Sequence, residues 1–185
     1  KYYMPDFLSA NLSYSSSGTL KKLILGDYRA SFGQGLVLNK SFSINSFSSS
    51  NFYKRRNSIS PYHSTNEYNF LRGVAATLGS DNFDFNLIFS ANSVDATLKD
   101  GAYTSIVTTG LHNTELLLSR RRNMREYLVA ANATYSGDFY TIGCTSAFYR
   151  YDKECGKIAK EYNKYQIYNG LWGNISLSGT ISLGT

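Results

Sequence analysis

The sequence predicts an all-β fold: an antiparallel transmembrane β-barrel, which we expect to be a segment of a larger barrel with long loops on one side. The first reason lies in 82–96, where Phe83, Phe85, Leu87 and Phe89 share one parity and mainly polar residues occupy the other. Such alternation places the two sets on opposite faces of a strand. The segment is longer than the usual soluble strand of about five or six residues. It reaches the roughly nine to eleven residues that cross a bilayer as a tilted strand.

Composition supplies the second reason. The chain is 42% hydrophobic, and no stretch approaches the roughly 18 consecutive apolar residues of a helical membrane span. The composition does not exclude a membrane β-barrel, because only alternate residues of its strands meet lipid. The 16 Tyr and 11 Phe residues favour strands. Composition alone favours a soluble β-sandwich, which we keep as the alternative fold.

Connection lengths supply the third reason. Short turns alternate with long loops, as in outer-membrane barrels, where the turns lie on one side of the membrane and the loops on the other. The short turns are at 15–19, 79–81 and 136–138, and the long loops are at 39–65, 97–123 and 152–164. The last part of 97–123, from 114 to 122, has the composition of a short helix.

Seven segments have the alternation of spanning strands, bounded by turn residues or polar loops. They are 6–15, 20–38, 67–78, 82–96, 124–135, 139–151 and 166–182. Seven is an odd number and too few to close a barrel alone, so we expect a piece of a larger one. In the second segment we expect Ile24, Tyr28 and Phe32 to face lipid, and Asp27 and Arg29 to pair in the lumen.

The third segment contains one conflict with this pattern. Arg72 falls on its apolar side, and either a bulge near 71–73 or snorkelling to an interface would accommodate it. The fifth segment fits well, since Tyr127 and Tyr135 stand at the two ends of an apolar face. That is the arrangement expected of a strand that reaches both aromatic girdles of a membrane barrel.

Charged residues provide the candidate functional sites. We expect Asp27, Arg29, Glu67 and Asp84 to form a lumenal polar network that lines a pore, holds a plug or simply fills the interior. The long loops carry basic clusters suited to lipopolysaccharide phosphates, with an ordinary solvated rim as the equal alternative. These clusters consist of Lys54, Arg55, Arg56, Arg120, Arg121 and Arg122. The net charge of +6 is compatible with an anionic partner.

Catalysis and metal binding have weak support. A barrel lipid hydrolase would need Ser, His and a polar orienting group, and the two histidines, His63 and His112, both lie in expected loops. No Cys/His spacing supports zinc, and we expect no metal or other cofactor. Cys144 and Cys155 are expected to be unpaired, because the strand separates them by roughly 20 Å. Nucleic acid is not expected as a partner, since girdle positions explain many aromatics.

A family resemblance rests on GDYRASFGQGLVL, residues 26–38. Three further segments fit the same pattern in order and spacing: SPYHSTNEYNFLRGVA, TGLHNTELLLSRR and YLVAANATYSGDFYTIG. The chain resembles a group of Bacteroidota outer-membrane proteins in which a helix-hairpin-helix segment, similar to competence DNA-uptake proteins, precedes a long β-barrel region. The resemblance covers most of 23–143 and implies the fold and the location. This chain lacks the helix-hairpin-helix segment, so DNA binding is not implied.

We therefore expect a non-enzymatic protein of the cell outer membrane that acts in transport or as a component of an envelope complex. Its expected partners are outer-membrane lipid, lipopolysaccharide and other envelope proteins. The alternative is a soluble or surface β-sandwich binding module, such as an adhesin or glycan binder. An outer-membrane lipid hydrolase, dependent on His112, ranks third.

Overall fold

The computed structural model describes residues 7–32, 35, 37–39, 58–64, 66–157, 161 and 170–181. Ten strands and one helix lie in this part of the chain. They are β1 (Asn11–Ser15), β2 (Leu20–Phe32), β3 (Leu38–Asn39), β4 (Ser58–Pro61), β5 (Leu71–Gly79), β6 (Phe83–Lys99), β7 (Ala102–Val107), α1 (Glu115–Arg120), β8 (Met124–Ser136), β9 (Tyr140–Tyr151) and β10 (Trp172–Ile181). Within these residues, no helix is long and apolar enough to cross a membrane.

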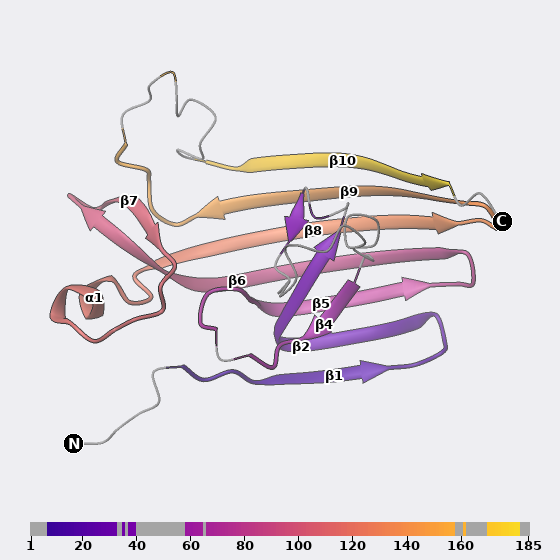
Figure 1. Ribbon diagram of the computed structural model, residues 1–185, viewed down its shortest axis with the longest axis horizontal. Coiled ribbons are helices and arrows are strands. Elements are labelled where there is room, and N and C mark those ends of the chain that lie inside the picture. The colour runs from indigo at the N-terminus through magenta and orange to yellow at the C-terminus, as the bar shows by residue number, and fades with distance from the viewer. Residues whose placement is uncertain are drawn as a thin grey trace.

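The strands form one antiparallel sheet in the order β1-β2-β5-β6-β8-β9-β10 (Figure 1). Strands β3 and β4 pair with β2, and β7 pairs with β6. The all-β antiparallel prediction is confirmed, and each of the seven expected segments overlaps one strand of this path. Among the described residues, β1 and β10 are the ends of the path and do not pair with each other, so the sheet is not closed into a barrel.

Strand β2 departs from the expected spanning strand 20–38. Its first part pairs with β5 as far as Tyr28, opposite Leu71. From Tyr28 onward it pairs with β4, and its last two residues pair with β3. Gly26 has φ +98° and lies against the carbonyl of Ala10, where a Cβ atom would collide. A glycine is therefore required where β2 changes partners.

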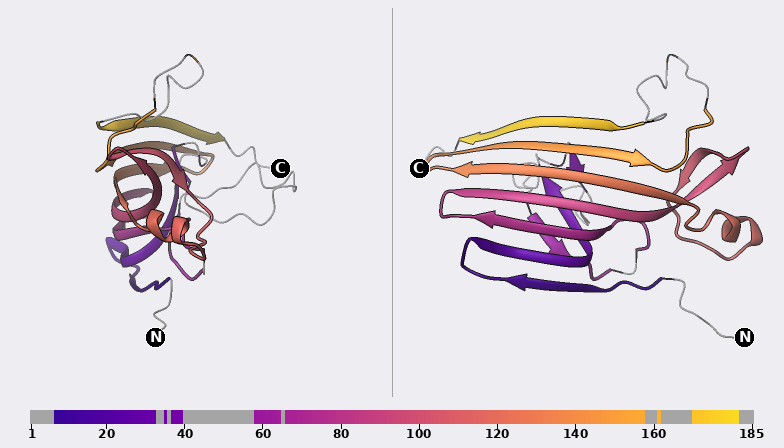
Figure 2. Two further views of the ribbon diagram at one scale, coloured as in Figure 1. Left: turned by 90° about the vertical axis from the view of Figure 1, so that its left-hand side faces the viewer. Right: turned by 180° about the vertical axis from the view of Figure 1, so that it is seen from behind.

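The end of β2, with β3 and β4, forms a unit that we call the inner segment. It crosses one face of the sheet (Figure 1), and the sheet curves around it (Figure 2, left). We call the covered face the inner face and the opposite one the outer face. The core between the inner segment and the sheet consists of Ile24, Tyr28, Ala30, Phe32, Leu38, Ile59, Leu71, Ala75, Ile88, Leu128, Ala130 and Ala147.

This core corrects the expectation that Ile24, Tyr28 and Phe32 face lipid. All three are buried against the inner face, whereas Leu25 is exposed on the outer face. The Tyr28 hydroxyl donates to the carbonyl of Phe89 at 2.8 Å, which fixes the Tyr28 ring against the sheet. The predicted alternation of β2 is confirmed, but the face of β2 that carries Ile24, Tyr28 and Phe32 is the enclosed one.

The region expected as the loop 97–123 contains regular structure of its own. Strand β6 continues to Lys99, turns at Asp100 and Gly101, both with positive φ, and returns as β7. Helix α1 follows, in the expected place, with Thr114 as its N-cap: the Thr114 hydroxyl accepts a hydrogen bond from the Leu117 N–H at 3.2 Å. These elements extend beyond one end of the sheet, which we call the loop end (Figure 1).

Candidate functional site

The outer face of the sheet carries three rows of apolar residues, each running across the strands. The pairing register places Leu25, Val74, Phe89, Val129 and Phe148 directly opposite one another in the first row. The second row is Leu23, Ala76, Leu87, Ala131, Ser146 and Ile175, and the third is Leu78, Phe85, Ala133, Cys144 and Leu177. Together we call these rows the apolar band.

Large side chains of the apolar band are exposed. Phe89 and Val129 are each 51% exposed, and Leu177 is 81% exposed. Contiguous apolar patches of this kind are rare on monomeric soluble proteins and mark sites of membrane or protein contact. On β8 the band is bounded by Tyr127 and Tyr135, eight residues apart, which is about 26 Å at a rise of roughly 3.3 Å per residue. A membrane barrel has an apolar band about 25 Å tall, flanked by aromatic girdles.

The inner face carries the opposite pattern, a ladder of buried polar side chains. The Thr77 hydroxyl donates to the Asn86 amide oxygen at 2.7 Å, and the Asn86 amide donates to the Asn132 oxygen at 3.1 Å. The Asn132 amide then donates to the Thr145 hydroxyl at 2.9 Å. Asn132 and Thr145 are each 1% exposed. The ladder crosses β5, β6, β8 and β9, and its hydrogen bonds offset the cost of burying polar groups.

The sequence already contained a signal for this ladder. Asn86 and Asn132 lie on the polar parity of their strands, directly opposite each other in the register. The parity predicts which face they share, but their hydrogen bond depends on the relative register of β6 and β8. That register is not visible in either strand alone.

The four residues expected to form one lumenal network each have a different partner. Asp27 binds Arg72 of the neighbouring strand, with Nε–Oδ1 at 2.6 Å and Nη2–Oδ2 at 2.9 Å. Arg29 instead lies over the ring of Tyr62, 4.6 Å from its centroid. Asp84 pairs with Lys21 at 2.7 Å, at the short-turn end of the sheet.

The Asp27–Arg72 pair also accounts for the conflict noted at Arg72. Arg72 lies on the same parity as Val74 and Leu78 and therefore on the outer face. Its charge is compensated by Asp27, which is 1% exposed, and its Nη2 also donates to the Leu8 carbonyl at 3.0 Å. A guanidinium paired in this way at the edge of the apolar band is less costly than an unpaired charge beside apolar side chains.

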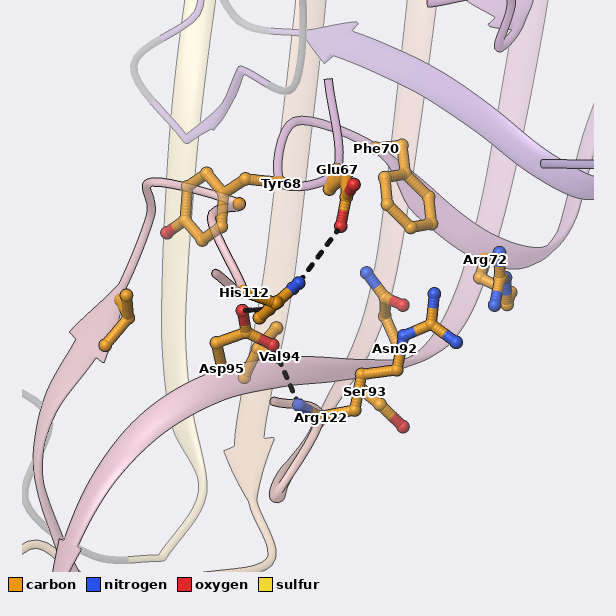
Figure 3. A pocket seen from close by; sticks show the side chains of 12 residues that line it. Glu67, Tyr68, Phe70, Arg72, Asn92, Ser93, Val94, Asp95, His112 and Arg122 are labelled. Atoms are coloured by element: carbon orange, nitrogen blue, oxygen red, sulfur yellow. Dashed lines mark hydrogen bonds and ion pairs between the residues drawn. The ribbon is translucent and has the colours of Figure 1, made fainter. Parts of the chain in front are cut away.

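Glu67 belongs to a small pocket at the loop end, whose side chains converge on His112 (Figure 3). The His112 Nε2 lies 2.7 Å from Asp95 Oδ2, and its Nδ1 lies 3.8 Å from Glu67 Oε2. The Arg122 backbone N–H donates to the other Asp95 oxygen at 2.8 Å. The cavity is about 90 Å³, and the His112 side chain is 4% exposed.

This pocket connects three parts of the chain. Asp95 comes from β6, Glu67 from the segment before β5, and His112 and Arg122 from the segments on either side of α1. Burial, reinforced by the carboxylate of Glu126, raises the pKa of Tyr68 in the pocket wall, so its hydroxyl stays protonated at neutral pH. An imidazole between two carboxylates is suited to clamping loops or binding a proton. Within the described ranges, no three His, Cys, Asp or Glu side chains could hold a metal ion.

The remaining predicted residues divide between two regions. Arg120, Arg121 and Arg122 lie at the end of α1, at the loop end of the sheet. Lys54, Arg55 and Arg56 lie outside the described residues. Cys144 and Cys155 are not joined by a disulfide, as predicted, and Cys144 is exposed in the apolar band.

Comparisons with known proteins found no relative of this chain. No family model, curated protein or solved structure matches this chain.

Proposed function

We propose that this chain forms part of the wall of an outer-membrane β-barrel, with a non-enzymatic role in transport or in an envelope complex. One observation carries the proposal: the outer face exposes a continuous apolar band, whereas the face that carries the polar ladder and the core under the inner segment is enclosed. Exposed Leu87 and Phe89 alternate with buried Asn86, Ile88 and Ser90 on β6. Lipid is the surrounding medium in which this alternation is favourable.

The inner segment supports a plugged or filled interior. Phe32, Leu38 and Ile59 pack directly on the inner face, and the Tyr149 hydroxyl donates to the Val37 carbonyl at 3.1 Å. Barrel interiors can be plugged by loops in this way. Transport would then require the inner segment to shift, whereas a role in an envelope complex would leave it in place.

The competing β-sandwich would require a second sheet over the apolar band. The one layer that the described structure packs on this sheet is the inner segment, and it lies on the opposite face. A lipid hydrolase would require His112 to activate a nucleophile. His112 lies between the carboxylates of Asp95 and Glu67, and this arrangement fits a clamp between chain segments better than a catalytic base.

Quenching of a fluorescent label by brominated lipids tests the membrane proposal. Cys144 lies in the apolar band and can be labelled in a Cys155→Ser variant reconstituted in vesicles. The matched control places the label at Asn174→Cys in a cysteine-free background. Asn174 is exposed, but it has the inner-face parity of β10. We expect strong quenching at 144 and weak quenching at 174. Equal quenching at both positions, or none at either, would overturn the proposal.

A further inference from the structure

Immediately beyond the apolar band, toward the loop end, the outer face becomes basic. Tyr127 and Arg150 are directly opposite each other on β8 and β9, one row above Val129 and Phe148. Arg125 lies two residues before Tyr127 and therefore on the same face, one row further. Both arginines are exposed, and Tyr127 is half-buried. We call Arg125, Tyr127 and Arg150 the basic rim.

The basic rim differs from the neighbouring Arg72 in one important respect. Arg72 is bound in a two-point ion pair by the buried carboxylate of Asp27, so its charge is already compensated. The acidic residue nearest to the rim, Asp152, accepts a hydrogen bond from the backbone N–H of Arg125 at 2.8 Å. The side chains of Arg125 and Arg150 project from the outer face and can bind an external anion.

A groove in the apolar band lies directly below the rim. It has a volume of about 390 Å³ and crosses β5, β6, β8 and β9 between the first and second apolar rows. The small side chains of Ala76 and Ala131 form a hollow beside the bulky Phe89 and Phe148. The groove lining is almost entirely apolar, so its natural occupant is a hydrocarbon chain rather than a polar ligand.

We propose that the basic rim and this groove together bind one lipid that carries an anionic phosphate headgroup. The guanidinium groups of Arg125 and Arg150 bind the phosphate oxygens, for which their planar, multiple-donor geometry is suited. Tyr127 lies between them at the level of the headgroups, where amphipathic rings are favoured. One acyl chain fills the groove beneath. This inference rests on the proposed membrane location, because it requires the apolar band to face lipid.

Lipid co-purification tests the site. The full chain is reconstituted in bilayers of phosphatidylcholine with a minor share of phosphatidylglycerol, re-extracted in mild detergent, and its bound lipid is measured by mass spectrometry. We expect phosphatidylglycerol to be enriched over its bulk share. In Arg125→Gln/Arg150→Gln, enrichment should fall by roughly fivefold for each arginine removed. Ala131→Phe, which fills the groove without changing charge, should also reduce it.

The control variant, Lys99→Gln/Lys157→Gln, removes the same charge from two exposed positions, one at the end of β6 and one in the segment after β9. It should keep the wild-type enrichment. Equal losses in the control and in the rim variant would show a general charge effect and overturn the site, as would wild-type protein without enrichment. Ala131→Phe with wild-type enrichment would show that the groove contributes nothing and would also overturn the site.

The label at Cys144 separates this inference from the membrane proposal. Every variant is first checked for quenching by brominated lipids. Protein that is quenched but shows no phosphatidylglycerol enrichment contradicts the lipid site alone. Protein that is not quenched in any bilayer contradicts both proposals.

Discussion

The outer and inner faces of the same sheet follow opposite rules. On β6, β8 and β9, the outer face exposes Leu87, Val129 and Phe148, while the inner face encloses Asn132 and Thr145. A soluble sheet normally places its apolar side against a core and its polar side in water. The difference teaches that period-two alternation reports two distinct faces without saying which one is enclosed. The inner segment decides that, because it packs on the inner face and buries the core there.

Breaking the Asp27–Arg72 ion pair should give the largest effect. Arg72→Gln leaves the buried Asp27 carboxylate without its cationic partner, and we expect a loss of about 3 to 5 kcal/mol in unfolding free energy. Lys21→Gln breaks a pair whose side chains are 33% and 46% exposed, so it should cost less than about 1 kcal/mol. Urea unfolding in vesicles measures both. Similar losses would mean that Asp27 is not enclosed.

A charge introduced in the middle of the apolar band sharpens the comparison between the faces. Ala131→Arg places a guanidinium in the central apolar row and should destabilise the inserted protein by about 2 to 4 kcal/mol. Asn174→Arg, on the inner parity of β10, should cost much less, because its side chain is exposed on a polar face. The same unfolding measurement applies. A larger penalty at 174 than at 131 would reverse the assignment of the faces.

Truncation of the inner ladder tests whether its hydrogen bonds are structural. Asn132→Ala leaves the Asn86 amide and the Thr145 hydroxyl without their shared partner, which should cost about 1 to 3 kcal/mol. Ser146→Ala, at an outer-face position next to Ala131 in the register, is the control and should be nearly neutral. A neutral Asn132→Ala would indicate that water reaches the ladder and that the inner face is open.

The smallest effect is expected at the loop-end pocket. His112→Ala removes the side chain that bridges Asp95 and Glu67 and should release the loop around α1, with little change in the stability of the sheet. Hydrogen exchange of 108–123 should become faster, corresponding to about 1 kcal/mol of local stability, while β8 and β9 stay protected. His63→Ala, at an exposed position, should leave the exchange unchanged. Faster exchange throughout the sheet would show that the pocket also stabilises the sheet.

The sequence by itself determined the seven strands of the main path and their two faces, but not β4 and β7, which lie in the expected loops 39–65 and 97–123. Alternation placed Phe85 and Val129 on one face and Asn86 and Asn132 on the other, since side-chain parity is a local property of an extended chain. It also located the short helix after Thr114.

The tertiary structure decided the contacts between residues that lie far apart in the chain. The strand expected to continue to Leu38 turns inward after Tyr28, because β4, thirty residues later, provides its new partner. The partner of Asp27 is Arg72 rather than Arg29, and His112 meets Asp95 and Glu67 from three separate segments. Strand periodicity contains no information about such pairings. They depend on which neighbour and which register give the lowest free energy for the whole sheet.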